Sequence, residues 1–505
     1  MQNLQKLSSF ISKETSFNFI KALLKEFPTA EIFLVGGAVR DFALGNQDVN
    51  DYDFVVRNVS AKKLSSFLKK HGLVNLVGRH FGVFKFVPTP VARGRRGQKL
   101  SWEAFDIALP RTEHSLGTSG GYKDFEIQSN PKLPIELDLS RRDFTINALA
   151  WDLGKNELVD LFDGLKDLKK KIIRTVGQPK IRFAEDYSRM LRAVRFACQL
   201  DFEIDKPTWQ FIKKNINLIN KTKNNDRVVP YETIAKELLK AFYFNPVKAL
   251  DLFDASNIIK ETMPELLKMK KCIQPKNWHT EGDVWRHTRL CLSLMNSAKF
   301  KKRFGAEKPG AQLIMGVLAH DLGKPYTIQT PKKDKVDRIR YYNHDTVGAE
   351  LFSKICKRLK LSSPPHYGID CDQTAWLIKN HLVDVQIKEM KNTTVEKYFL
   401  NPGVPGNDLI KLLYLDAQGT IPPSGRPDMG TFNILMKRIK EIKKLPRKKT
   451  QKITPPILNG HEIIKKFKLK PGPRIGELLD ALREQQLTGK IKTKIQAAQF
   501  LKNYL

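Results

Sequence analysis

The chain has 505 residues, 41% of them hydrophobic and 28% charged, which is too long for one core and typical of a protein with several domains. No apolar stretch approaches the roughly 20 residues that span a bilayer, and the N-terminus lacks the apolar core of a signal peptide, so we expect a cytoplasmic protein without a membrane partner. The 88 Lys and Arg residues exceed the 53 Asp and Glu residues, and the resulting net charge of +35 indicates a polyanionic partner, for which RNA or DNA is the natural candidate.

The five cysteines are scattered and show no Cys-x-x-Cys spacing, so we expect buried thiols rather than a disulfide framework or a thiolate zinc site. They are Cys198, Cys272, Cys291, Cys356 and Cys371.

The first 28 residues predict one amphipathic helix that covers a sheet. Residues 32–35 then form a short β-branched and apolar run that ends on Gly36 and Gly37. Such a strand followed by a glycine turn is typical of a backbone that something approaches closely, and a phosphate chain is the natural visitor.

Asp51 and Asp53 open the second apolar run. Side chains on a strand alternate between faces, so the two carboxylates are expected to point the same way. Paired carboxylates beside a glycine turn favour a site for Mg²⁺ and nucleotide phosphates. The alternative is a hairpin rim of solvated aspartates.

Residues 61–71 predict a helix, and residues 73–77, 81–87 and 101–109 predict strands. A glycine-punctuated basic loop lies at 89–99. Asp106 stands within the last apolar run, where an unpaired carboxylate would be unfavourable. We therefore expect Asp106 to be the third acidic residue of the site, which suits nucleotidyl transfer.

The segment 111–134 has the Gly and Pro content of a mobile loop over the site. Arg141 and Arg142 follow it, and paired arginines suit triphosphate or ribose.

Residues 181–200 predict a helix in which Arg189, Arg192 and Arg195 recur every three residues along one flank. With Asp186 one turn earlier, a carboxylate and an arginine could read the edge of a base. A solvated basic helix is the alternative.

These segments occur in one order: Gly36-Gly37-x-x-Arg40-Asp41, Asp51-x-Asp53, Arg141-Arg142-Asp143 and Glu185-Asp186-x-x-Arg189. The order resembles the class II tRNA nucleotidyltransferase and poly(A) polymerase family from about residue 32 to 239. The resemblance implies that Gly36, Gly37 and Arg40 contact the nucleotide and that Asp51 and Asp53 hold Mg²⁺. It also implies that Arg141, Arg142 and Asp143 bind ribose and triphosphate, and that Asp186 and Arg189 read the base with Arg192 and Arg195 nearby. Tyr187 departs from the family, which often has Pro there.

From Trp278 onward histidines accumulate, and this stretch resembles the HD metal-dependent phosphohydrolase domain over about residues 279–418. The resemblance implies metal ligands at His287, His320, Asp321 and Asp416, which suit Zn, Mn, Ni or Fe. His344 and His381 would add a second metal or bind phosphate. An HD fold that serves only to bind tRNA is the alternative.

The expected fold is an α/β nucleotidyltransferase head, with a mixed sheet and helices, followed by an all-α neck, body, HD domain and tail. The expected divisions are a head at 1–150, a neck and body at 151–270, an HD domain at 271–420 and a basic RNA-binding tail at 421–505.

The resemblance implies that a monomer or homodimer adds C, C and A to the 3′ end of tRNA from CTP and ATP. The first alternative is an enzyme that adds only A, or a poly(A) polymerase. The second is an HD phosphohydrolase with an RNA-binding head.

Overall fold

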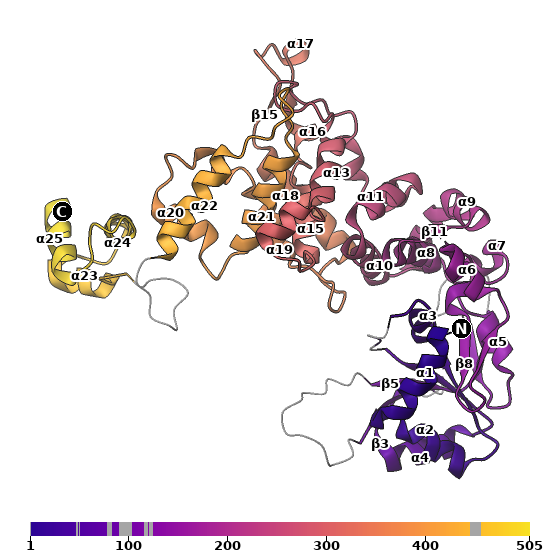
Figure 1. Ribbon diagram of the computed structural model, residues 1–505. Coiled ribbons are helices and arrows are strands. Elements are labelled where there is room, and N and C mark those ends of the chain that lie inside the picture. The colour runs from indigo at the N-terminus through magenta and orange to yellow at the C-terminus, as the bar shows by residue number, and fades with distance from the viewer. Residues whose placement is uncertain are drawn as a thin grey trace. The chain divides into compact units, whose positions relative to one another are not determined.

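The computed structural model describes residues 2–46, 49, 51–77, 83–89, 104–115, 120, 125–444 and 456–505. The chain divides into two compact units, one of Met1–Asn245 and Leu252–Glu261 and one of Pro246–Asp251 and Thr262–Leu505 (Figure 1). Residues 90–99 of the predicted basic loop and the basic segment 447–452 lie outside the described residues. Among the residues that are described, no helix is both long and apolar enough to cross a membrane.

The first unit is built on a mixed sheet, as predicted. Within the described ranges it has seven strands, and β2 and β5 run parallel whereas the other neighbours run antiparallel. In spatial order the strands are β3 (Gly72–Val77), β4 (Val83–Pro88), β5 (Phe105–Ala108), β2 (Asp53–Arg57), β1 (Glu31–Val35), β8 (Leu149–Asp152) and β9 (Glu157–Asp160). The strands predicted around 32–35, 73–77, 81–87 and 101–109 are thus confirmed, with β5 shorter than expected.

Side-chain alternation along β2 gives the sheet two apolar faces. Phe54 faces an aromatic layer in which Phe17 stacks on Phe105 with ring centroids 5.2 Å apart. Val55, the next residue, belongs to a buried cluster with Val35 and other apolar side chains on the opposite side. The sheet is therefore covered on both faces. This packing holds in place the end of the sheet at which β1 ends and β2 begins, where Val35 lies opposite Asp53.

The N-terminal segment forms two helices, so the prediction of one helix was wrong. Helix α1 (Gln2–Lys13) ends before Glu14, whose backbone is extended, and a 3₁₀ turn (Thr15–Phe17) leads into α2 (Asn18–Glu26). The break lets the Phe17 ring pack on Phe54 and Phe105 of the sheet. Burial of this ring stabilises the fold more than one continuous helix would.

The segment predicted as a mobile loop at 111–134 contains a hairpin instead. Strand β6 (Arg111–Ser115) pairs antiparallel with β7 (Phe125–Ser129). The glycines that suggested a loop lie between the two strands, whereas the strands themselves carry Thr112, Phe125 and Ile127, which favour β structure.

The other main helices of the first unit are α3 (Gly37–Ala43), α4 (Ala61–His71), α5 (Ile135–Ser140), α6 (Gly164–Lys170), α7 (Pro179–Glu185), α8 (Ser188–Leu200), α9 (Lys206–Asn215), α10 (Tyr231–Phe244) and α12 (Ile258–Thr262). Helices α3 and α4 contact the sheet, whereas α8 packs on α10 and α7 on α9. The last helix, α12, ends at the boundary with the second unit. The helix predicted at 61–71 is confirmed, whereas the one predicted at 181–200 is broken between α7 and α8.

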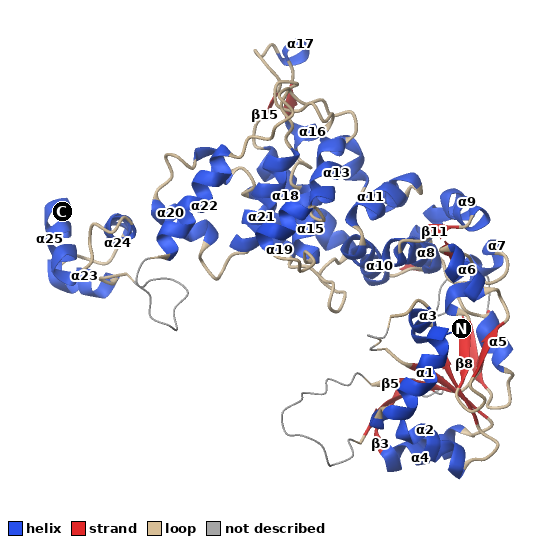
Figure 2. Ribbon diagram, viewed as in Figure 1, coloured by secondary structure: helices blue, strands red, loops and turns tan. Residues whose placement is uncertain are grey.

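The second unit is almost entirely helical (Figure 2). Its central helices are α13 (Val284–Leu294), α15 (Ala311–Ala319), α18 (His344–Leu359), α19 (Cys371–Lys379) and α21 (Gly406–Gly419), which pack on one another. Helix α20 (Asn392–Phe399) lies between α19 and α21 in the chain and packs on α22 (Gly430–Lys443), which follows α21. The C-terminal helices α23 (Gly460–Phe467), α24 (Pro473–Leu487) and α25 (Lys494–Tyr504) share an apolar core of their own.

Cys356 and Cys371 form a disulfide between α18 and α19, so the expectation of no disulfide was wrong. The two helices pack side by side, which brings the cysteines' Cα atoms to 6.0 Å. Sequence spacing does not reveal such a tertiary approach. Cys272 and Cys291 are buried thiols, as expected.

Candidate functional site

Three carboxylates meet at the edge of the head sheet. Asp53 begins β2 and is the register partner of Asp106 on the parallel strand β5, while Asp51 lies two residues earlier and is exposed. Burial, followed by the negative charge of Asp51, raises the pKa of Asp53 from 3.8 to about 6, with Asp106 adding to the shift and Arg142 opposing it. A cluster that disfavours its own ionisation in this way suits a divalent cation, which would remove the repulsion.

Lys85 is a neighbour of this cluster that the sequence did not single out. It is the register partner of Asp106 on β4, and its Nζ lies 2.8 Å from Asp106 Oδ1. One lysine in a strand of otherwise mostly apolar residues does not mark a site residue. Its position beside Asp106 becomes evident only when β4 is known to pair with β5.

The glycine turn lies beside Arg142. Gly36 has φ +73° and precedes α3, and a Cβ on it would lie 2.6 Å from Arg142 Nη1. That guanidinium also donates to the carbonyl of Asn147 at 3.3 Å and pairs with Asp138 at 3.4 Å. Only glycine combines this backbone conformation with the close approach of an arginine.

A buried polar chain connects the glycine turn to α8. Arg40 Nη1 donates to Asn147 Oδ1 at 2.8 Å, and Asn147 Nδ2 donates to Asp143 Oδ1 at 3.1 Å. Arg192 then donates twice to Asp143 Oδ2, at 2.9 and 2.6 Å. Asp143 is buried, but the charge of Arg192 holds its pKa well below the usual range. These hydrogen bonds join three segments of the chain, the first and second about a hundred residues apart and the second and third about fifty, and Asn147 is a member that the sequence did not identify.

Asp186 and Arg189 are joined by a backbone hydrogen bond, from the Arg189 N–H to the Asp186 carbonyl at 3.1 Å, while their side chains have other partners. Asp186 has an extended backbone between α7 and α8, and its carboxylate accepts a hydrogen bond from the Ser188 N–H at 2.8 Å. Arg189 is held by Glu185 instead, and it also donates to the Arg141 carbonyl at 3.2 Å. The prediction that Asp186 and Arg189 share one helix was therefore wrong, and Glu185 was missed as a partner.

Arg141 itself pairs with Asp138, whose carboxylate is nearly inaccessible, at 2.8 Å. Asp138 thus holds both members of the predicted arginine pair.

Arg195 is buried in the interior of the first unit, where its partner is Glu237. Its Nε donates to Glu237 Oε2 of α10 at 2.8 Å, and its guanidinium covers the Phe196 ring at 3.5 Å. Both Arg195 and Glu237 are buried, so this pair ties α8 to α10.

Tyr187, the departure from the family pattern, anchors a different part of the chain. Its N–H donates to the Gly120 carbonyl at 3.0 Å, and its ring occupies the space that a side chain at Gly120 would need. Proline has no N–H and could not form this hydrogen bond.

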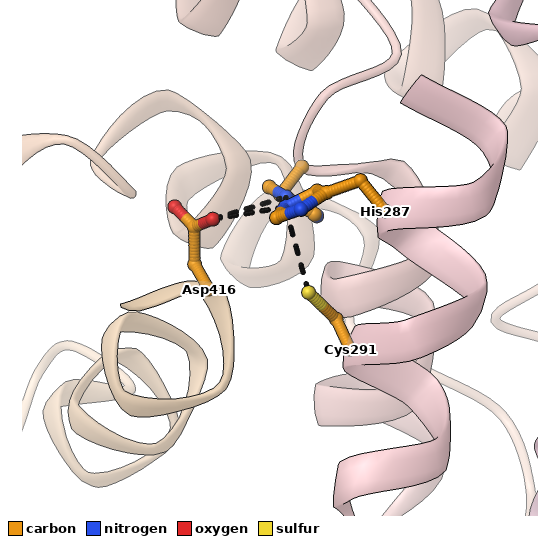
Figure 3. A group of neighbouring side chains, drawn as sticks. His287, Cys291 and Asp416 are labelled. Atoms are coloured by element: carbon orange, nitrogen blue, oxygen red, sulfur yellow. Dashed lines mark hydrogen bonds and ion pairs between the residues drawn. The ribbon is translucent and has the colours of Figure 1, made fainter. Parts of the chain in front are cut away.

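The second unit brings together all six residues of the predicted HD site. His287 comes from α13, His320 and Asp321 follow α15, and Asp416 comes from α21. His287 Nε2 lies 3.0 Å from Asp416 Oδ1 (Figure 3). The same nitrogen lies 3.4 Å from His320 Nε2. Asp321 Oδ2 lies 3.4 Å from His320 Nε2.

His344 and His381 form the other half of this centre. Their Nε2 atoms are 3.3 Å apart, and each lies 3.6 Å from Asp321 Oδ1. Asp321 therefore directs one oxygen toward each half. Lys324 Nζ lies 2.7 Å from Asp321 Oδ2 and was not predicted.

The other ring nitrogen, Nδ1, of each of these four histidines already has a hydrogen-bond partner. The Nδ1 atoms of His320, His344 and His381 lie 2.6 to 2.8 Å from backbone carbonyls, which only accept, so these nitrogens carry the proton. His287 Nδ1 faces the Glu281 carboxylate at 2.9 Å, and Glu281 is a further unpredicted neighbour.

A neutral ring with its proton on Nδ1 turns an Nε2 lone pair toward the ring opposite it in each half. Despite burial, Cys291 and Asp416 raise the pKa of His287. Asp321 likewise raises the pKa of His381 despite its burial. Burial and the neighbouring His381 lower the pKa of His344 to about 4, which keeps that ring neutral. A cation in each half would replace the repulsion of the lone pairs by coordination, so the residues fit two metal ions with Asp321 between them.

Known proteins resemble the chain along most of its length. The family description "Poly A polymerase head domain" matches residues 32–174, and "HD domain" matches residues 284–412. An A-adding tRNA nucleotidyltransferase of Deinococcus radiodurans is 30% identical over 379 residues, which cover 73% of this chain and 79% of that protein. A multifunctional CCA protein of Nitrosococcus oceani is 31% identical over 370 residues, which cover 73% and 78%.

Solved structures share the fold. A Thermotoga maritima CCA-adding enzyme complexed with tRNA has a TM-score of 0.59 at 19% identity, covering 99% of this chain and 98% of that one. A CCA-adding enzyme in complex with CTP also gives a TM-score of 0.59 at 19% identity, with the same coverage.

Proposed function

Because this chain belongs to the family of tRNA nucleotidyltransferases and poly(A) polymerases, we propose that it adds C, C and A to the 3′ end of tRNA from CTP and ATP. The observation that carries the proposal is the group of Asp51, Asp53 and Asp106 beside the Gly36 turn and Arg142. Its support from relatives lies in the several multifunctional CCA proteins of similar sequence. The net charge of +35 on the chain suits tRNA, a polyanion, as the second substrate.

In this reaction the 3′-hydroxyl oxygen of tRNA forms a bond to the α-phosphorus, and the bond from that phosphorus to pyrophosphate breaks. Asp51 and Asp53 would hold Mg²⁺, which when bound neutralises charge on the phosphate oxygens. Asp106 accepts the hydroxyl proton, and Lys85 keeps Asp106 oriented through their ion pair.

The arginines and glycines would hold the nucleotide. We assign triphosphate and ribose binding to Arg141, Arg142 and Asp143, with Gly36, Gly37 and Arg40 forming the adjacent turn. Asp143 acts by fixing Arg192 and Asn147, to which it is hydrogen-bonded.

Asp186 and Arg189 would select the base, with the carboxylate accepting from it and the guanidinium donating to it. Arg189 is oriented by Glu185, whereas Arg195 supports α8 from inside. As a test, Asp186→Ala should relax the choice between CTP and ATP in single-turnover assays, and unchanged selectivity would refute the assignment.

The experiment for the head site is Asp53→Ala in the full chain. Addition of CMP and AMP to tRNA should fall by about a hundredfold to a thousandfold, since a group that stabilises the transition state is removed. Binding of tRNA in a filter assay should stay within about twofold because basic side chains carry it. Asp163→Asn, which removes the charge of an exposed carboxylate of the same unit and suits its left-handed backbone, is the matched control. Retained turnover in Asp53→Ala would reject the assignment.

We infer a second activity, hydrolysis of phosphate esters at the HD centre, because paired Nε2 atoms face each other in both of its halves. His287, His320 and Asp416 would hold one divalent ion, His344 and His381 the other, and Asp321 would lie between them. Equilibrium dialysis against Mn²⁺ should give two HD-site ions in the intact chain and one in His344→Asn. Full binding by that variant would contradict the two-ion proposal.

A further inference from the structure

Cys291 is a buried thiol that lies within the first half of the HD centre. It is on α13, four residues after His287, so the two side chains leave the same face of the helix. Figure 3 shows both pointing toward Asp416 on a different helix. Cys291 Sγ lies 3.5 Å from His287 Nε2.

The four candidate ligand atoms of Cys291, His287, His320 and Asp416 all lie within 4.8 Å of one another. A tetrahedral zinc ion with ordinary bond lengths separates two nitrogen ligands by about 3.4 Å and a nitrogen from a sulfur by about 3.6 Å. The corresponding distances here are 3.4 Å between the imidazole nitrogens and 3.5 Å from nitrogen to sulfur. These two separations match those around a tetrahedral zinc ion, and Asp416 Oδ1 lies 3.0 Å from His287 Nε2 and 3.8 Å from His320 Nε2.

The opposing helix leaves room for the sulfur. A Cβ at Gly419, three residues after Asp416 on α21, would lie 2.5 Å from Cys291 Sγ. Any larger residue at Gly419 would displace the thiol from the histidine. The helix pair is therefore shaped around a sulfur atom at this point.

The two halves of the HD centre offer a metal ion different ligand atoms, because Cys291 lies in the half that contains His287. The half that contains His344 and His381 offers nitrogen and oxygen atoms, whereas the half that contains His287 also offers sulfur. Thiolate favours zinc over manganese and magnesium, which prefer oxygen.

We propose that Cys291 is a metal ligand of the HD centre and makes the half that contains His287 selective for Zn²⁺. Zinc bonds to the thiolate as well as to His287, His320 and Asp416, and the thiol proton passes to solvent when the ion binds. This inference rests on the second activity proposed above only in that both require metal in this centre.

The test uses the full chain, stripped of metal and loaded with one equivalent of Co²⁺. A sulfur-to-cobalt charge-transfer band in the near ultraviolet is expected, and it should be absent from Cys291→Ser and Cys291→Ala. Cys272→Ala, which removes another buried thiol of the same unit, should keep the band. Zinc affinity should fall at least about tenfold in Cys291→Ser, as losing even an outer partner of a ligand does that, while Mn²⁺ affinity should change by less than about twofold.

Zinc K-edge absorption of the unaltered chain makes the test independent of how the variants fold. One sulfur neighbour at about 2.3 Å is expected. Zinc surrounded by nitrogen and oxygen alone, or a cobalt band that survives in Cys291→Ser, would overturn the role of Cys291 and leave metal binding by the centre intact. Failure to bind any metal would overturn both proposals.

Discussion

The carboxylate cluster of the head should make the metal-free protein less stable at neutral pH. Asp53 has a folded-state pKa of about 6 against an ordinary value of 3.8. The folded state therefore prefers the protonated carboxyl, and stability is lost as the pH rises from 3.8 to about 6. Two pKa units correspond to about 3 kcal/mol, and water at this partly exposed group reduces the expected effect to about 1–3 kcal/mol.

Asp53→Asn keeps the shape of the side chain and removes the charge. In EDTA its free energy of unfolding should exceed that of the unaltered chain by about 1–3 kcal/mol at about pH 7.5 and match it near about pH 4. The assay is urea denaturation of both proteins at several pH values, so that contributions of other groups cancel.

Added Mg²⁺ should raise the stability of the unaltered chain but not that of Asp53→Asn. Asp163→Asn, at an exposed carboxylate, should show no such pH-dependent gain. Equal stabilities of Asp53→Asn and the unaltered chain at every pH would refute the claim that the ionised Asp53 carboxylate destabilises the metal-free fold.

Two further predictions concern residues around the cluster. Gly36→Ala should raise the KM for nucleotide, because the backbone at φ +73° would cost about 1–3 kcal/mol and the new Cβ would meet Arg142; Gly37→Ala, where the nearest side-chain atom is 3.7 Å away, should be much milder in the same kinetic assay. Arg195→Met should lower the free energy of unfolding by up to about 3–5 kcal/mol, because Glu237 would keep only the more distant Arg192, at 4.0 Å. Glu237→Leu in the same chain should restore most of the lost stability, and a folded double variant that no longer adds nucleotides would instead assign Arg195 to the substrate.

Local patterns in the sequence predicted the framework of the head well. The β-branched run before Gly36 and the spacing of apolar residues at 61–71 each specify an element without help from distant contacts. The family resemblance and the fold class are confirmed by relatives that span most of the chain.

What local patterns missed depends on contacts between distant segments. The pairing of Cys356 with Cys371 needs α18 and α19 to lie together, and Lys85 meets Asp106 only because β4 pairs with β5. Cys291 was predicted only to be a buried thiol, since His320 and Asp416, which lie near it together with His287, come from distant parts of the chain.

Nucleotide omission tests the central claim most directly. The full chain is incubated with tRNA that lacks its 3′ end, supplied with CTP alone, ATP alone or both, and with tRNA that already ends in CC. Our account predicts two C residues with CTP alone, one A on the CC end with ATP alone, and complete CCA with both. Addition of A only to the CC end, a long A tail, or release of phosphate without extension would contradict it.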